Sequence, residues 1–231
     1  MGKAAARKRG SQSSMQDLLA AAIEVFAQRG PEAATVDEIS RKAGLNKRMI
    51  YHYFGSKEQL YRQSLQYVYE QFRSLDISLS AMLLPVEELV ETLVRQYYTF
   101  LHDHPNFVRL ISYENLSGGE VVRQLGLGGQ KAQIITALRL ALEKGKAERQ
   151  FRSGIDVPEL LVSILALCFF YFSNANTMGE FVSEVAMTKP ALERRVAHVV
   201  DLLLHGIVDV QRALPPVSDQ DQDQQAWKGR T

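Results

Sequence analysis

The histidines near residue 103 and the single cysteine are the residue types that first suggest catalysis. His102, Asp103 and His104 could ligate a metal, but histidines two positions apart on a helix point to different sides. We interpret them as a polar helix end before Pro105. Cys168 lies in an apolar segment without a neighbouring base or cation, so we interpret it as a small core residue. We therefore expect no metal and no cofactor, and an all-α enzyme is a distant alternative.

A cationic and aromatic segment suggests a different chemistry, the reading of a DNA major groove. On a helix, Ile50 and Phe54 share one face and are expected to be buried, which leaves the opposite face outside. In a major groove a cation bonds guanine acceptors and an apolar edge contacts the thymine methyl, at about 1 to 3 kcal/mol of discrimination per good contact. The candidates for base reading are Lys47, Arg48, Met49, Tyr51 and His52.

Two polar residues next to this segment are candidates for phosphate contacts. Thr35 and Lys57 stand at expected helix N-termini, where free backbone N–H groups and the positive dipole end attract anions. Such contacts position a DNA-binding unit while another helix reads the bases. The competing interpretation is that the aromatic residues form a core and the cations a solvated face. Capped helix starts and a glycine turn within one domain-sized span favour DNA binding.

The positions of these residues depend on helices, because apolar residues recur at spacings of three and four and strand-like alternation is rare. Capping boxes at Thr35 with Glu38 and at Ser56 with Gln59 mark two helix starts, and Asn46 is the expected cap of the helix between them. The expected helices are 14–30, 35–44, 47–53, 56–79, 86–102, 105–115, 120–125, 130–146, 157–177 and 191–212.

These elements predict an all-α protein in which a three-helix helix-turn-helix unit leads into a larger helical bundle. Gly44 and Leu45 form the tight connection that sets two short helices at a large angle. We expect a basic flexible arm over residues 1–12, a DNA-binding domain over 13–57, a ligand-binding and dimerisation domain over 58–214, and a flexible tail over 215–231.

Charge is unevenly distributed along the 231 residues, although the net charge is only +1. Residues 1–57 hold ten Lys and Arg against five Asp and Glu, whereas the rest hold seventeen against twenty-one. This asymmetry suggests a basic contact surface on an acidic body. The N-terminus lacks the apolar stretch of a secretory signal, and Leu160 to Phe172 is too short for a membrane span of about 20 residues. We expect a cytoplasmic protein without membrane contact.

Two uninterrupted runs carry a family pattern, TVDEISRKAGL at residues 35–45 and IYHYFGSKEQL at residues 50–60. Over roughly residues 13–65 the chain resembles the TetR family of transcriptional regulators. Asn46 stands where the family often has serine, and it caps a helix equally well. Residues 47–49 fall in the stretch that varies with the operator. The resemblance therefore implies DNA binding without specifying the operator sequence.

The resemblance also implies a homodimer whose two recognition helices enter successive major grooves of a palindromic operator. By this analogy Thr35, Tyr53 and Lys57 contact phosphates, and the base-reading candidates face base edges. The basic run over residues 7–9 either follows the DNA backbone, enters a minor groove, or is a solubilising tail.

Two apolar stripes near the C-terminus are the expected dimerisation surface, because one of them is too wide for packing on a single neighbour. Paired with their symmetry mates they would form a four-helix interface. Internal packing within one chain is the alternative. The stripes comprise Leu160, Ile164, Leu167, Tyr171, Leu192, Val196, Val199, Val200, Leu203, Leu204 and Ile207.

A ligand pocket is expected within the helices from Leu60 to Asn176, with apolar walls and a few polar groups. Each candidate residue could instead be an ordinary core or surface residue. The candidates are Tyr97, Phe100, Phe107, Tyr113, Asn115, Phe169, Phe170, Asn174 and Asn176.

We therefore expect a DNA-binding transcriptional regulator, a repressor that a small-molecule effector releases from its operator. Release requires that the effector binds the DNA-incompetent form more tightly. A tilt of the helix beginning near residue 57 would change the spacing of the recognition helices. Control by a partner protein, without a small-molecule effector, remains the alternative.

Overall fold

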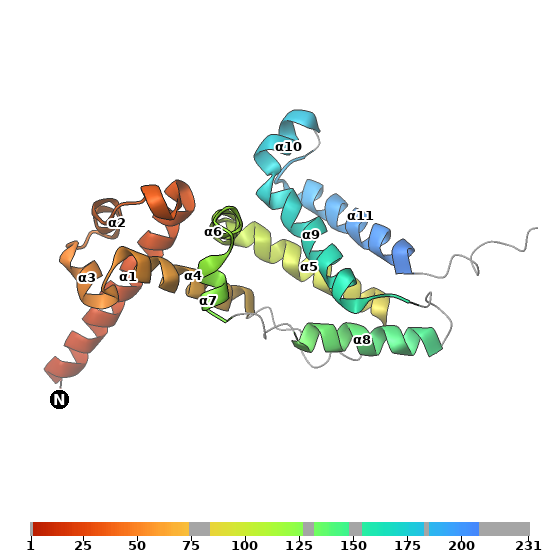
Figure 1. Cartoon of the computed structure of the whole chain (residues 1–231), viewed down its shortest axis with the longest axis horizontal. Coiled ribbons are helices and arrows are strands. Elements are labelled where there is room, and N and C mark those ends of the chain that lie inside the picture. Colours follow the sequence, from red (N-terminus) through yellow and green to blue (C-terminus); the bar gives the residue numbers. More distant parts are fainter. Residues whose placement is uncertain (1, 74–83, 127–131, 148–153, 183–184, 208–231) are drawn as a thin grey trace, which may run out of the picture.

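The computed structural model describes residues 2–73, 84–126, 132–147, 154–182 and 185–207, and in these ranges the chain forms helices and no strands. The expected all-α fold is therefore confirmed. An N-terminal unit comprises α1 (Gly2–Ala33), α2 (Val36–Ala43), α3 (Arg48–Phe54) and α4 (Lys57–Arg73), and it lies at one end of the molecule (Figure 1).

The first helix is longer than the sequence pattern indicates. It begins at Gly2 rather than near Ser14, so the backbone of the expected flexible arm is helical. Alanine, lysine and arginine, which dominate residues 3–9, have high helix propensity, and this accounts for the extension. The backbone leaves helical geometry at Gly30, with φ 79° and ψ 162°, and Pro31 begins the last turn.

The N-terminal unit is held together by apolar side chains that follow the expected stripes. α1 contacts α2 and α4, and α3 packs between α4 and α1. Each helix contributes at least one side chain with almost no solvent exposure, so burial fixes which edge of each short helix faces outward. The buried set includes Leu18, Ala22, Phe26, Ile39, Ile50, Phe54 and Leu60.

The C-terminal part is built around α5 (Val86–Asp103), which contacts three other long helices. These are α8 (Ala132–Ala147), α9 (Val157–Ser173) and α11 (Lys189–Ile207). α6 (Pro105–Leu116) and the short α7 (Glu120–Gln124) lie between this bundle and the N-terminal unit (Figure 1). The buried apolar residues of both parts form one continuous cluster.

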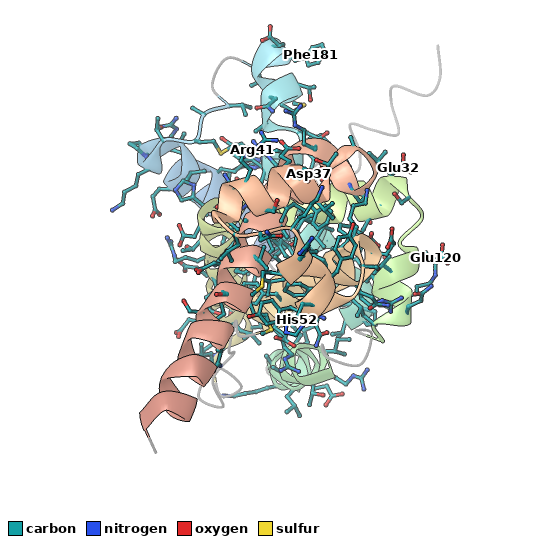
Figure 2. The ribbon with its side chains drawn as sticks, turned by 90° about the vertical axis from the view of Figure 1, so that its left-hand side faces the viewer. Glu32, Asp37, Arg41, His52, Glu120 and Phe181 are labelled. Atoms are coloured by element: carbon teal, nitrogen blue, oxygen red, sulfur yellow. The ribbon has the colours of Figure 1, made fainter. Side chains whose placement is uncertain are left out.

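The expected helix 157–177 ends a few residues early, at Ser173, because the chain bends by 80° between α9 and α10 (Ala175–Phe181). Asn174 has non-helical dihedral angles at the bend. Its side-chain amide donates to the carbonyl oxygen of Phe170, at 3.2 Å, and so competes with the helical bonding pattern. As a result α10 extends away from the other helices, with Phe181 near its end (Figures 1 and 2).

The other helix ends agree with the expected ones to within a few residues where they can be compared. α4 is described only to Arg73 and α11 only to Ile207, so the expected ends near residues 79 and 212 lie outside the described residues. The expected tail over 215–231 also lies outside them. Within the described residues no single helix has the length and apolar character to cross a membrane, although the bent pair α9 and α10 meets that test together.

Candidate nucleic-acid interface

The turn between α2 and α3 has the geometry that the sequence predicts. Thr35 Oγ1 accepts a hydrogen bond from the Glu38 N–H at 3.2 Å, which caps α2. Gly44 ends α2 in the left-handed region, with φ 67° and ψ 23°, and its N–H bonds to the Arg41 carbonyl. The Leu45 N–H bonds to the Ser40 carbonyl at 3.0 Å. These bonds satisfy the last carbonyls of α2 and fix the direction in which α3 begins.

Asn46 caps α3 as expected. Its side-chain oxygen accepts a hydrogen bond from the Arg48 N–H at 2.9 Å, and its carbonyl accepts one from the Met49 N–H. On the inner face of α3, Ile50 is fully buried and Phe54 is 4% exposed. The inward and outward faces of α3 are therefore set by these two side chains.

The outward face of α3 contains most of the base-reading candidates. Arg48, Tyr51 and His52 are exposed, and the tyrosine is 53% exposed. Figure 2 looks onto the N-terminal unit and shows His52 on the side facing the viewer. Lys47, at the N-terminal end of this face, is also exposed. Met49 is half-buried against the core, so only part of its side chain is accessible.

Three cations of this unit are paired with acidic side chains at the surface. Lys47 pairs with Asp37 at 3.0 Å, Lys42 with Glu24, and Arg29 with Glu38. Exposed pairs of this kind contribute about 0 to 1 kcal/mol, so a DNA phosphate can displace the carboxylate at little cost. No described residue forms an ion pair or hydrogen bond with the guanidinium of Arg48.

The phosphate candidates occupy different environments. Thr35 is exposed at the start of α2, and Tyr53 is half-buried with its ring 5.0 Å from that of His52. Lys57 has a structural role that the sequence did not reveal. Its ammonium donates to the carbonyls of Glu32, at 3.2 Å, and Ala34, at 3.1 Å, at the end of α1. An ammonium has three donors, so one remains for another acceptor.

A buried carboxylate joins the N-terminal unit to the rest of the chain. Glu114 of α6 is 3% exposed and accepts from the Tyr61 hydroxyl of α4 at 2.8 Å and from the Val122 N–H of α7 at 3.3 Å. Burial, together with the bond to Glu114, raises the pKa of Tyr61. Burial and the same carboxylate raise the pKa of Tyr69 to about 12. No sequence motif marks Glu114, because its partners come from α4 and from α7.

A second contact between the two parts involves a glycine. The ring of Tyr113 on α6 approaches Gly30 so closely that a Cβ at that position would lie 3.0 Å from a ring carbon. Tyr113 is one of the ligand candidates; its ring lies against Gly30 of α1 and, with Asn176, also lines an open groove. α6 therefore contacts α1 through the Tyr113 ring and α4 through the Glu114 carboxylate.

The ligand candidates do not form one site. Tyr97, Phe100 and Phe107 are buried together, each with its ring centroid 5.3 to 5.4 Å from that of Phe72. Burial raises the pKa of Tyr97. The others are dispersed: Phe169 is half-buried, Asn174 is used at the α9 bend, and the exposed ones are Asn115, Phe170 and Asn176.

More than half of the residues in the expected dimerisation stripes are buried within a single chain. Six of their residues are buried inside a single chain, because α9 and α11 both pack on α5. The width of the stripes is therefore explained without a second chain. The six are Leu160, Ile164, Val196, Val199, Leu203 and Ile207. Leu167, Tyr171, Leu192, Val200 and Leu204 are half-buried. The large apolar residues that are exposed on the described parts of the two helices are others, Val162, Phe170 and Leu202.

The cysteine and the histidines considered for catalysis lie in the core of α9 and at the end of α5. Cys168 is fully buried in α9, and burial raises the pKa of its thiol to about 12. His102 and Asp103 are exposed at the end of α5, and His104 stacks on Phe100. In the part of the chain that the structure describes, no three His, Cys, Asp or Glu side chains gather closely enough to hold a metal ion.

A helix-turn-helix unit with an outward cationic and aromatic edge, attached to a separate helical bundle, defines a DNA-binding regulator. Residues 18–63 match the family profile described as bacterial regulatory proteins of the tetR family. Residues 85–203 match a tetracyclin repressor-like C-terminal domain. The chain belongs to the TetR family of transcriptional regulators.

Two similar proteins and one solved structure agree with this assignment. The transcriptional repressor NicS of Pseudomonas putida is 31% identical over 206 residues, which cover 89% of this chain and 97% of NicS. The transcriptional repressor SCO4008 of Streptomyces coelicolor is 26% identical over 69% of this chain and 78% of its own length. A TetR family regulator from Marinobacter aquaeolei has a TM-score of 0.59 at 22% identity, over 88% of this chain and 99% of that one, and shows the shared fold.

Proposed function

We propose that this regulator is a repressor that binds a palindromic operator as a homodimer and leaves it when a small-molecule effector binds. The observation that carries the proposal is the outward face of α3, where Arg48, Tyr51 and His52 are exposed beside a structurally fixed turn. The names of NicS and SCO4008 support repression as the direction of control.

In this proposal α3 lies in the major groove and its outward face reads base edges. The Arg48 guanidinium suits the acceptors of guanine, and Tyr51 and His52 add hydrogen-bonding groups. Lys47 and the accessible part of Met49 extend the same contact. Thr35, Tyr53 and the remaining donor of Lys57 hold the flanking phosphates.

The proposed dimer uses the outer surfaces of α9 and α11. Val162 and Phe170 lie two helical turns apart on α9, and Leu202 is exposed on α11. The half-buried members of the two stripes would be covered further by the second chain. Removal of this apolar surface from water stabilises the dimer by about 25 cal/mol per Å². A two-fold protein then presents two α3 helices to a two-fold DNA site.

We place the effector in the C-terminal bundle, beside the buried rings of Tyr97, Phe100 and Phe107. A ligand there acts only if it prefers the conformation that does not fit DNA. α6 follows directly after α5, and its Glu114 and Tyr113 contact α4 and α1. A shift of α6 would therefore tilt the N-terminal unit and change the distance between the two α3 helices from one DNA turn, about 34 to 36 Å.

Selection of duplexes from a randomised DNA library tests the proposal. We expect enrichment of a palindrome, and sedimentation of the complex should give an even number of chains per duplex. Fluorescence anisotropy at several salt concentrations then measures affinity, which should fall as salt rises. A library that shows no enrichment at low ionic strength would overturn the proposal. Binding that persists as a single chain would overturn the dimer alone.

A further inference from the structure

An open groove lies where the N-terminal unit meets the C-terminal bundle. Its volume is about 760 Å³, within the range of small-molecule sites. α1, α5, α6, α9 and α10 all contribute to its walls, together with Met187 before α11. α6 contacts both α1 and α9 and lies between the two parts in Figure 1. The groove that it lines therefore crosses the boundary between them.

The described residues of the groove carry ionisable groups of one kind. Arg109 of α6 is exposed in its wall, and His102 of α5 adds a second ionisable nitrogen group. Among the residues that the structure describes, no aspartate or glutamate lines the groove. Among the described residues Arg109 has no ion pair and no side-chain hydrogen bond, in contrast to Arg29 and Arg95, which are paired with glutamates. The guanidinium is therefore available to an external anion.

The apolar part of the groove is unusually open to solvent. Leu116, at the end of α6, is 85% exposed, and Met187 is 39% exposed. Phe172 adds a half-buried ring from α9. When a ligand covers apolar side chains of this size, their surface is removed from water, and this favours binding. An apolar surface beside an unpaired cation suits a ligand with both an apolar body and a negative charge.

We propose that this groove binds a small organic anion, with its charged group at Arg109 and its apolar body over Leu116, Phe172 and Met187. The site is separate from the effector position beside Tyr97, because those rings are buried within the bundle and do not line the groove. The groove also includes Ala27 and Gln28 of α1. A bound anion therefore touches the DNA-binding unit and α6 at once, next to the Tyr113 contact with Gly30.

A fluorescent anion tests the charge requirement. 8-Anilinonaphthalene-1-sulfonate has an apolar body and a sulfonate, and N-phenyl-1-naphthylamine has the same body without the charge. We expect saturable binding of the sulfonate by the folded wild-type protein, with about tenfold weaker binding by Arg109→Gln, because the variant loses a charge-assisted contact. The neutral probe should bind both proteins equally. Arg139→Gln, an exposed arginine on α8 outside the groove, is the matched control and should bind like the wild type.

A second variant tests the location. Asn176 is exposed in the groove wall, so Asn176→Trp fills the space without disturbing the core, and it should weaken both probes. Circular dichroism and thermal melting establish that each variant is folded. Equal affinity of Arg109→Gln and wild type for the sulfonate overturns the proposal. Equal loss of the neutral probe in Arg109→Gln also overturns it, as does unchanged binding of both probes by Asn176→Trp.

Discussion

Arg48 extends from the first turn of α3 with an exposed guanidinium, while the backbone of the same residue is held by the Asn46 cap. The cap fixes where the side chain starts, and the absence of an acidic partner among the described residues leaves its donors available. A guanidinium that is positioned but unpaired can make the bidentate contact with guanine. At the scale of single residues, this is the basis of the proposed sequence reading.

Arg48→Ala should therefore weaken operator binding by about 1 to 3 kcal/mol and relax the base preference at one position of each half-site. Library selection and anisotropy titration measure the two effects. Arg139→Ala on α8 removes an equal charge far from α3 and should leave both unchanged. An Arg48→Ala variant with the wild-type preference would show that Arg48 does not read a base.

Lys57→Ala should weaken binding to all DNA sequences alike, and the slope of log affinity against log salt should become shallower by about one unit. The variant also loses the donor to the Glu32 and Ala34 carbonyls, so the N-terminal unit should unfold at lower temperature. Lys144→Ala, at an exposed lysine on α8, is the control for charge. An unchanged slope would mean that Lys57 serves only to cap α1.

At the scale of elements, α6 connects the N-terminal unit to the C-terminal bundle. It contacts α4 through the Tyr61 hydroxyl and the buried Glu114 carboxylate, and α1 through the Tyr113 ring and Gly30. In the proposed mechanism these two contacts would transmit a movement of α6 to the N-terminal unit.

Tyr61→Phe removes the side-chain donor to the buried Glu114 carboxylate and leaves the backbone N–H of Val122, so the free energy of unfolding should fall by about 1 to 3 kcal/mol. Urea denaturation measures it. Tyr67→Phe is the matched control, because Tyr67 lies on the same helix and is 45% exposed. If the two variants are equally stable, the Tyr61 contact does not hold α4 against α6.

Gly30→Ala should also destabilise the protein, by about 1 to 3 kcal/mol, because φ is 79° and the added methyl would meet the Tyr113 ring. Gly179→Ala is the comparison, since its Cβ would meet no atom within 4 Å and Gly179 lies inside α10. Thermal melting of the two variants would contradict this account if Gly30→Ala were as stable as Gly179→Ala.

The elements also show how much of the structure could be predicted from sequence. Caps at Thr35, Asn46 and Ser56 were predictable because each bonds a backbone N–H only two or three residues ahead. The bend near Asn174 was not, because no glycine or proline among residues 173–177 marks it. Glu114 was also missed, since its burial depends on α4, which precedes it by about 50 residues.

At the scale of the whole molecule, apolar surface determines how the chain assembles. An amphipathic pattern identifies which residues of α9 and α11 avoid water, but it does not say whether a neighbour in the same chain or a second chain covers them. In the structure the inner residues of α9 and α11 pack on α5, whereas Val162, Phe170 and Leu202 are exposed. These three are the residues on which the proposed dimer depends.

Leu202→Glu should therefore convert the dimer into a monomer, because it places a charge in an apolar contact. Analytical ultracentrifugation measures the mass in solution. Leu140→Glu, at a leucine that is 52% exposed on α8, tests whether any exposed leucine has the same effect. Two variants that both remain dimeric would move the interface away from α11.

Chemical modification of the selected operator with dimethyl sulfate tests the insertion of α3 into the major groove most directly, because it methylates guanine N7 in that groove and adenine N3 in the minor groove. The account predicts that N7 methylation blocks binding at two symmetric places, about 10 to 10.5 base pairs apart, and that Arg48→Ala removes this interference at one guanine of each half-site. Interference confined to adenine N3, or none at all, would contradict it.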